Sequence, residues 1–490
     1  MRHFVLIIMV STCLNLSSQN MPFPQHYPYM QGSIKPSNLT QTQMDNDVTS
    51  FYNSWKAQYF KNNCGTDQYY VWFGDEDTSA ICVSEGQGYG MLIAAYMAGY
   101  DANAKTIFDG LYNFYKAHPS SINSNLMAWQ QGTSCNDING VDAATDGDMD
   151  IAYALLLADK QWGSSGAINY LQAANDIINA IMSSEINPLT YSITFGDWVT
   201  SSDIEYYATR PSDFMPDHFR AFYNSTSDNK WNTVIDECYA VVNTIQANNS
   251  PSTGLIPDFV VNCNTTPVPA TANFFESPYD GEYYYNSCRV PWRLATDYLI
   301  TGETRSQAAV GKINTWIENN TSADPANVMA GYTLSGGNIS GNNYDDPSFI
   351  GPFAVGAMLD SANQSWLNGM YDHLIAQNLA DNTYFGNTLK MLCLIVLSGN
   401  YWPPYTVSGI ENIPDNSVID IFPNPAKNFI QIKASGKSEI EILNIEGQII
   451  KSISADESIT TIDISELVSG MYFVKVKSED GIAVKKFVKE

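Results

Sequence analysis

Segment after segment of the first 400 residues repeats apolar side chains at intervals of three or four positions. About eleven such segments follow one another, among them GQGYGMLIAAYMAGY (86–100), MDIAYALLLADKQW (149–162) and TLKMLCLIVLSGN (388–400). This spacing places the apolar side chains on one face of an α-helix, and Ser, Asp, Asn or Gly near many segment ends supports helix termini there. The succession of about eleven helical segments predicts a mainly α fold, with antiparallel helix pairs arranged as a toroid. Periodicity alone leaves other helical arrays open.

The pattern changes after Trp402, the last of ten tryptophans. Residues 418–490 contain no Trp, Cys, Arg or His, and apolar and polar residues alternate in IDIFPNPAKNFIQIKA (419–434) and MYFVKVKSEDGIAVKKFV (471–488). Such alternation between Gly, Asn and Ser turns is typical of short β-strands. We therefore expect a helical domain at residues 19–403, a linker with proline at 404–417 and a small all-β sandwich domain at 418–490.

The first 18 residues, MRHFVLIIMVSTCLNLSS, have a basic start, a short apolar run and a small-residue end. This is the pattern of a secretory signal peptide, and the run is too short for a membrane span. Cys13 leaves a lipoprotein signal as an alternative, which Thr12 before it disfavours. No later apolar stretch is long enough to cross a bilayer. The chain is therefore expected to be exported.

Removal of the signal leaves seven cysteines, and their spacings match no metal-binding pattern. We expect at most a few disulfides and at least one cysteine that packs as a buried apolar side chain. The five histidines are scattered, so neither a metal nor an organic cofactor is expected.

The formal net charge is −27, from 51 acidic and 24 basic residues. Nucleic acids and anionic membrane surfaces bind proteins through positive charge, so both are poor partners for this chain. The simplest explanation of the acid excess is solubility of a secreted protein. A neutral or cationic ligand is easier to accommodate.

Two acidic motifs precede helical segments. In AICVSEGQGYGM, Glu85 is followed by three glycines that would let a polymer approach the backbone, and a partly buried acid there could act as a general acid. In AATDGDMDIAY, Asp146, Asp148 and Asp150 alternate, so at least one must be paired or protonated. Each motif could instead cap its helix. An EF-hand is excluded because Ile151 and Leu157 replace its Gly and Glu.

A third motif, FFESPYDGEYYYNSCRVPWR (274–293), combines tyrosines and arginines, which suit a sugar subsite, with three acids, Glu276, Asp280 and Glu282. Sugar hydrolysis requires a carboxylate base, so any of the three is a candidate. Some of these tyrosines could be core residues. Trp129 and Trp198 are either core side chains or stacking platforms.

The segments SEGQGYGM, LMAWQ, ATDGDMDIAYALLLADKQW and YYYNSCRVPWRLATDY resemble the characteristic blocks of glycoside hydrolase family 8, and the likeness covers about residues 20–403. The resemblance implies an (α/α)6 barrel and an inverting endo-acting enzyme that cuts β-1,4-linked glucans, mixed-linkage glucans, xylans or chitosan. It implies that Glu85 is the proton donor and that Asp146 binds and distorts the sugar at the cleavage point. Arg289 would be an active-site arginine and Trp129 a subsite platform, and we expect further substrate contacts from Tyr285, Asn286 and Trp198.

One position departs from part of this family. In the branch with the best-known cellulases and xylanases the base is an Asp just before the (Ala/Ser)-Cys-Arg-Val-Pro-Trp-Arg block, and here that position is Asn286. In a second branch, with chitosanases, lichenases and some endoglucanases, this position is also Asn, and a Glu on an inserted upstream loop is the base. That likeness selects Glu276 over Asp280 and Glu282, which we expect to face solvent.

The C-terminal segments FPNPAKNFIQI, IEILNIEGQIIKS and IDISELVSGMYFVKVKSEDGIAVKKFVK resemble the sorting domain of the type IX (Por) secretion route of Gram-negative bacteria. This resemblance implies passage across the outer membrane, followed by release or attachment at the cell surface. The alternative, a carbohydrate-binding sandwich, is disfavoured because we expect no surface aromatic platform in this region beyond Tyr472.

Together these features predict a secreted, monomeric, inverting endo-β-1,4-glycanase. Its expected substrate is a β-glucan-type polysaccharide, namely mixed-linkage glucan, cellulose-like glucan or chitosan, rather than xylan. The acid excess slightly favours chitosan. A rival hypothesis is a non-catalytic glycan-binding surface protein on a degenerate hydrolase scaffold. Asn286 supports that rival, and Glu85 and Asp146 oppose it.

Overall fold

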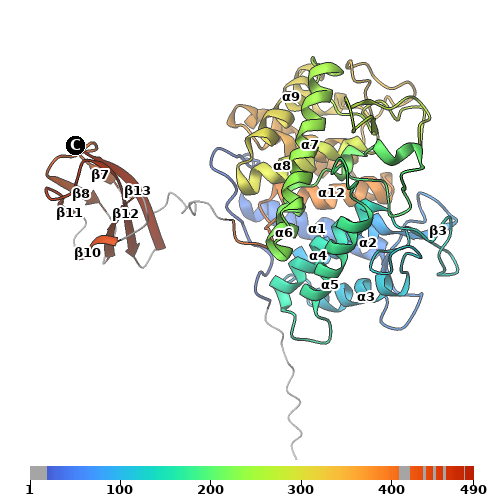
Figure 1. Ribbon diagram of the computed structural model, residues 1–490, viewed down its shortest axis with the longest axis horizontal. Helices are drawn as coiled ribbons and strands as arrows, with labels where there is room; N and C mark the ends of the chain where they lie inside the picture. The colour runs from blue at the N-terminus through green and yellow to red at the C-terminus, as the bar shows by residue number, and fades with distance from the viewer. Residues whose placement is uncertain (1–18, 408–419, 434–437, 445–448, 456–458, 479–480) are drawn as a thin grey trace, which may run out of the picture. The chain divides into compact units, whose positions relative to one another are not determined.

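The computed structural model describes residues 19–407, 420–433, 438–444, 449–455, 459–478 and 481–490 (Figure 1). The predicted signal peptide and residues 408–417 of the predicted linker lie outside these ranges. The chain divides into two compact units, with the boundary between Val407 and Ser408. Tyr405, in the predicted linker, packs on the first unit, where its hydroxyl donates to Asp217 across 2.7 Å.

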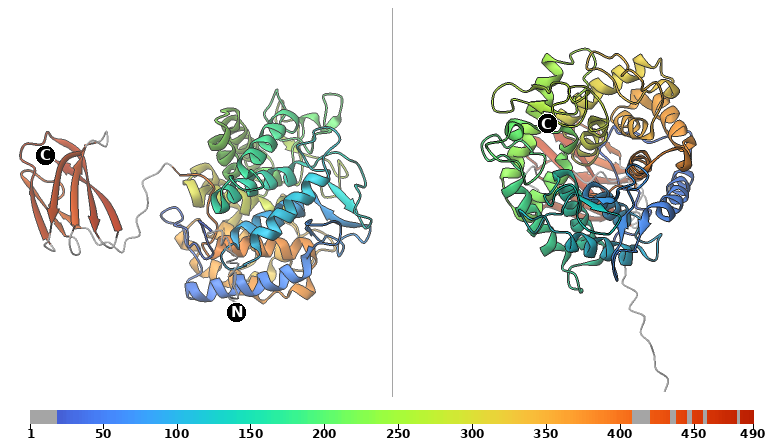
Figure 2. Two further views of the ribbon diagram at one scale, coloured as in Figure 1. Left: turned by 90° about the horizontal axis from the view of Figure 1, so that it is seen from below. Right: turned by 90° about the vertical axis from the view of Figure 1, so that its right-hand side faces the viewer.

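Six helices form a closed inner ring in the first unit: α2 (Ser84–Tyr96), α4 (Thr145–Trp162), α6 (Pro216–Thr226), α8 (Val290–Thr301), α10 (Pro347–Ala357) and α12 (Tyr384–Leu397). Each contacts the next, and α12 contacts α2. Almost every residue of α2, α8, α10 and α12 is buried, because neighbouring helices cover every face. The right-hand view of Figure 2 shows the helices of this unit arranged as a ring.

Six more helices pack outside this ring: α1 (Gln41–Tyr59), α3 (Ala104–Ala117), α5 (Tyr170–Ser184), α7 (Lys230–Asn248), α9 (Thr304–Asn320) and α11 (Gln364–Ala376). Each lies against the inner helix that precedes it in sequence, and α1 packs on α12. The outer helices are amphipathic. In α3, for example, Ile107, Leu111 and Phe114 face inward at helical spacing. The predicted (α/α)6 barrel is confirmed.

Short strands and one disulfide brace the loops at one end of the barrel. β1 (Phe60–Lys61) pairs with β2 (Tyr70–Val71), β3 (Ala80–Val83) with β4 (Gln130–Gly132), and β5 (Val260–Val261) with β6 (Val268–Pro269). The disulfide joins Cys64 to Cys135. The expectation of at least one buried, unpaired cysteine is confirmed, because five further cysteines in the described ranges are buried and form no disulfide: Cys82, Cys238, Cys263, Cys288 and Cys393. Within the described ranges, no helix is long and apolar enough to cross a membrane.

The second unit is a β-sandwich of two antiparallel sheets. One has the strand order β10-β9-β12-β13 and the other β11-β8-β7. The bounds are β7 Asp420–Phe422, β8 Phe429–Lys433, β9 Ser438–Leu443, β10 Ile449–Ala455, β11 Ile459–Asp463, β12 Gly470–Ser478 and β13 Gly481–Lys489. Alternate residues such as Ile430 and Ile432 point into the shared core. The fold confirms the predicted sandwich.

The expectation about aromatic platforms in this unit was wrong. Tyr472 stacks on Phe487 and is partly buried, whereas Phe422 and Phe429 are 41% and 48% exposed. Phe429 is exposed because it occupies the outward position of a strand whose next residue, Ile430, points into the core.

Candidate active site

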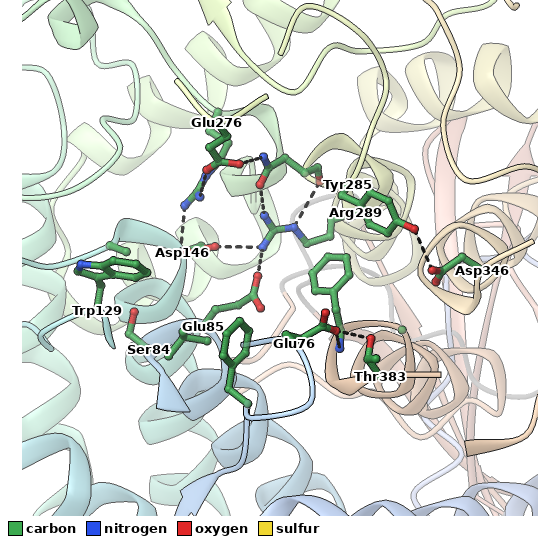
Figure 3. Close-up of a pocket in the computed structure, with 17 residues that line it drawn as sticks. Glu76, Ser84, Glu85, Trp129, Asp146, Glu276, Tyr285, Arg289, Asp346 and Thr383 are labelled. Atoms are coloured by element: carbon green, nitrogen blue, oxygen red, sulfur yellow. Dashed lines mark hydrogen bonds and ion pairs between the residues drawn. The ribbon is translucent and has the colours of Figure 1, made fainter. Parts of the chain in front are cut away.

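A cavity of about 470 Å³ lies at the N-terminal ends of the inner helices. Glu85 occupies the first turn of α2 and Asp146 the first turn of α4, while Arg289 directly precedes α8. The N-terminal end of a helix carries partial positive charge, which favours acidic side chains there. The cavity brings together all but one of the predicted site residues, namely Glu85, Trp129, Asp146, Glu276, Tyr285, Asn286 and Arg289 (Figure 3).

Helix capping does not explain the acidic motifs. The N-cap residues of α2 and α4 are Val83 and Ala144, and neither helix has a side-chain cap hydrogen bond. The capping interpretation of Glu85, Asp146 and Asp148 is therefore wrong. The structure gives these carboxyl groups other partners.

Arg289 holds the two principal acids together. Its Nη1 donates to Glu85 Oε2 across 2.7 Å and to Asp146 Oδ2 across 3.0 Å. Its Nη2 donates to the amide oxygen of Asn286 across 2.9 Å. The Arg289 side chain is only 1% exposed, so these contacts are made away from bulk water. A planar guanidinium with several fixed donors suits this task better than a lysine would.

A second arginine, Arg210, whose side chain is 11% exposed, shares Asp146 with Arg289. Its Nη2 lies 3.0 Å from Asp146 Oδ1, and its Nε donates to Asp213 Oδ2 across 3.1 Å. Its Nη1 also lies 3.9 Å from Glu276 Oε1. Neither Arg210 nor Asp213 is among the site residues predicted from the sequence. Both lie in RPSDFMPDHFRAFY, a segment with no periodic signal that would connect them to Asp146.

These contacts set different protonation states for neighbouring acids. Burial raises the pKa of Glu85 to about 7, although Arg289 opposes the shift. Burial also disfavours a charged Asp146, but Arg210 and Arg289 outweigh it and lower the pKa of Asp146 to about 2. Two acids with pKa values driven apart are the usual basis for separate acid and electrostatic roles. Tyr384 donates to Glu85 Oε1 across 2.9 Å and favours the charged form of Glu85.

The other acids of the α4 motif belong to the barrel interior. Asp150 makes two hydrogen bonds with Arg293, at 2.9 and 2.5 Å. Asp148 accepts from the Met127 amide across 2.9 Å, and burial raises its pKa well above the usual range. One acid is thus paired and the other favours its protonated form, as the close spacing predicted.

Glu276 enters the cavity from the loop between β6 and α8. Asn286 Nδ2 donates to Glu276 Oε2 across 2.7 Å. In the view of Figure 3, Glu276 and Glu85 lie on opposite sides of the Arg289 guanidinium. The side chain of Glu276 is 42% exposed and that of Glu85 16% exposed, so Glu276 has the greater access to water.

The expectation that Asp280 and Glu282 face solvent was wrong. Asp280 is fully buried and accepts hydrogen bonds from the backbone amides of Phe275, Glu276 and Ser277 at 2.6, 3.1 and 2.8 Å. Glu282 is partly buried and accepts from the Leu334 amide across 2.6 Å. Both carboxylates therefore serve as acceptors for backbone N–H groups of nearby loops.

Aromatic side chains flank the acids. Trp129 lines one side of the cavity, while Tyr285, Phe73 and Phe385 also line it. The predicted contact Trp198 is absent from the cavity lining and stacks on Phe275 with 6.0 Å between ring centroids. The tyrosine run divides as expected, since Tyr283 is a core residue and Tyr285 faces the cavity.

Comparison with protein families gives two matches. Residues 30–399 match the model of glycosyl hydrolases family 8, and residues 420–490 match that of the secretion system C-terminal sorting domain. A beta-glucanase of Niallia circulans is 49% identical over 395 residues, covering 81% of this chain and 94% of the relative. An endoglucanase of Bacillus sp. (strain KSM-330) is 40% identical over 396 residues, covering 79% of this chain and 83% of the relative.

Two solved structures are also similar to the barrel unit of this chain. The apo structure of a beta-1,3-1,4-glucanase from Paenibacillus sp. X4 is 50% identical, has a TM-score of 0.76 and covers 79% of this chain and 100% of its own. The xylose complex of Rex8A from Paenibacillus barcinonensis is 19% identical with a TM-score of 0.62, covering 76% of this chain and 98% of its own, and shows a shared fold.

Proposed function

This chain belongs to glycosyl hydrolase family 8, and from that premise we propose that its cavity hydrolyses mixed-linkage β-1,3-1,4-glucan with inversion at the anomeric carbon. The chain is a glycoside hydrolase, and its C-terminal sorting domain makes it a secreted or cell-surface protein. The relatives with 49% and 50% identity are a beta-glucanase and a beta-1,3-1,4-glucanase, which supports glucan as the substrate.

Glu85 is the proposed general acid. With a pKa of about 7, its carboxyl is about half protonated at neutral pH and largely protonated in mildly acidic solution, so it can protonate the leaving glycosidic oxygen. Arg289 does not need Glu85 as its sole counter-ion, because Asp146 contacts the same Nη1. Glu85 can therefore gain and lose a proton without leaving a buried arginine unpaired.

Glu276 is the proposed general base. Inverting hydrolysis requires a carboxylate that removes a proton from water on the opposite face of the sugar from the acid. Glu276 lines the same cavity as Glu85, is more exposed, and is separated from it by Arg289 and Asn286. Its presence in that cavity is the single observation that carries the proposal. The amide of Asn286 then no longer argues for a non-catalytic scaffold.

Asp146 and the aromatic residues complete the proposed site. With a pKa of about 2, Asp146 remains charged and can stabilise positive charge that develops on the distorted sugar ring. Trp129 offers a face on which a sugar ring can stack at one side of the cavity. Tyr285, elsewhere in the lining, offers an aromatic face and a hydroxyl that can contact the sugar. We also propose that the type IX machinery recognises the sorting domain during export.

Reducing-sugar assays on lichenan, carboxymethylcellulose, chitosan and xylan test this function. We expect the wild type to act fastest on lichenan and to release the α-anomer first, as NMR of early products would show. Glu276→Gln should lower kcat by about 10²–10⁴-fold, the usual contribution of a general base. Glu282→Gln is the matched control and should retain activity. A fully active Glu276→Gln would exclude Glu276 as the base, and a preference for chitosan or xylan would exclude the proposed substrate.

A further inference from the structure

The backbone that carries Glu276 is held by a single buried carboxylate. Asp280 is 0% exposed, and its two oxygens accept from three consecutive amides. Oδ2 accepts from Phe275 and Glu276, and Oδ1 from Ser277, at 2.6, 3.1 and 2.8 Å. Hydrogen bonds to an ionised acceptor are short and strong. Three of them in a row fix the backbone dihedral angles of residues 275–277.

Asp280 is itself attached to the barrel. The amide of Phe259 donates to the Asp280 carbonyl across 2.9 Å, and the Phe259 carbonyl accepts from the Ala270 amide across 2.9 Å. A Cβ at Gly281 would lie 2.2 Å from the Ala270 carbonyl oxygen, so the two arms of the loop are in close contact at this point. The carboxylate therefore connects the Glu276 turn to a tightly packed part of the loop.

Besides the Asp280 carboxylate, the Ser277 carbonyl closes the turn, since it accepts from the amides of Asn273 and Asp280 across 2.8 and 3.4 Å. Phe275 packs on Phe195 with 4.9 Å between ring centroids, yet it is 43% exposed. Asn286 and Arg210 contact only the side chain of Glu276. These contacts select a rotamer of Glu276 only after the backbone has placed its Cα.

We propose that Asp280 is a positioning residue that sets the place of Glu276 over the cleft, an inference that rests on the proposed role of Glu276 as base. Misplacement of a reacting group by about 1 Å can cost about 10²-fold in rate. Loss of the Asp280 carboxylate should therefore lower kcat while leaving substrate binding along the cavity nearly unchanged.

A double-mutant cycle tests this inference on the full-length protein with lichenan. Asp280→Asn retains the size of the side chain but has one oxygen to accept three amides. We expect it to lower kcat by about 10–100-fold, with KM changed less than about threefold. In the Glu276→Gln background, Asp280→Asn should cause no further loss, because a residue that acts only through the base has no effect once the base is gone.

Several outcomes would overturn the inference. The first is a wild-type kcat in the Asp280→Asn variant. The second is a kcat of the double variant that falls by the product of the two single-variant losses, which would indicate a general structural role for Asp280. A fully active Glu276→Gln would exclude the base and the positioning role together, whereas the first two outcomes leave the base intact. Glu282→Gln on the same loop is the control. If Asp280→Asn does not fold, Asp280→Glu retains the charge, displaces the acceptor by one methylene, and enters the same cycle.

Discussion

The amide nitrogen of Asn286 donates to the Glu276 carboxylate across 2.7 Å, while its amide oxygen accepts from Arg289 across 2.9 Å. An amide can make both contacts at once, whereas an ionised carboxylate cannot, because it has no donor. Asn286 and Glu276 therefore form a matched pair. The amide that first suggested a lost base connects the proposed base to the arginine that holds the proposed acid.

Asn286→Asp should reduce activity because it places two carboxylates in contact and removes the donor to Glu276. We expect kcat on lichenan to fall about 10-fold or more at pH 7 and to recover partly at lower pH, where the introduced carboxyl takes up a proton. Asn286→Ala removes the donor without adding charge, so its loss should not depend on pH in this way. Wild-type pH dependence in Asn286→Asp would contradict the matched pair.

The pH profile should report the protonation of Glu85. A general acid must be protonated, so kcat/KM should be highest below the Glu85 pKa of about 7 and fall as pH rises through it. Tyr384 donates to Glu85 and lowers its pKa, so Tyr384→Phe should raise that pKa and move the alkaline limb to higher pH. The measurement is kcat/KM for both proteins between pH 5 and about 9. A limb that stays in place or moves to lower pH would exclude this role of Tyr384.

Trp129 and Trp198 should differ in their effects on substrate binding. Trp129 lines the cavity, so Trp129→Ala should raise KM by about 10-fold through loss of a stacking face. Trp198 instead stacks on Phe275, and Trp198→Phe retains an aromatic ring there, so KM should stay near the wild-type value. Steady-state kinetics on lichenan compares the two. Equal increases in KM would place Trp198 in the substrate path.

The Cys64–Cys135 disulfide should stabilise the barrel without taking part in catalysis. It closes a loop with a sequence separation of 71, for which chain entropy predicts about 4 kcal/mol. The Cys64→Ser/Cys135→Ser double variant should show a lower Tm by calorimetry and retain kcat at low temperature. Reductant should lower the Tm of the wild type and leave that of the double variant unchanged. An unchanged Tm in the variant would indicate that another constraint replaces the bond.

Removal of the sorting domain should separate activity from export. The barrel is a compact unit that ends at Val407, so deletion of residues 416–490 should leave kcat on lichenan within about twofold. We expect the truncated protein to accumulate in the periplasm of its host, measured by activity in cell fractions beside the full-length chain. Its normal appearance in the medium would exclude the sorting role.

The sequence by itself predicted the barrel, the sandwich and the blocks that carry Glu85, Asp146 and Arg289, which all line the cavity. Outer helices such as α3 have one buried face and therefore a clear period, and Glu85, Asp146 and Arg289 lie in contiguous blocks beside helix starts. Periodicity is weaker for α8 and α10, because both are buried on every side. A helix or a motif can be predicted from sequence when the residues that define it are neighbours in the chain.

The family resemblance favoured Glu276, but only the tertiary structure showed the different surroundings of Glu276, Asp280 and Glu282. The three acids stand within seven residues on one loop, and spacing alone does not tell which one faces water. The buried Asp280 carboxylate accepts from three backbone amides, whereas the Glu276 side chain lines the cavity. Arg210 was missed for the same reason, since its contact with Asp146 joins chain segments that are brought together only when the barrel closes.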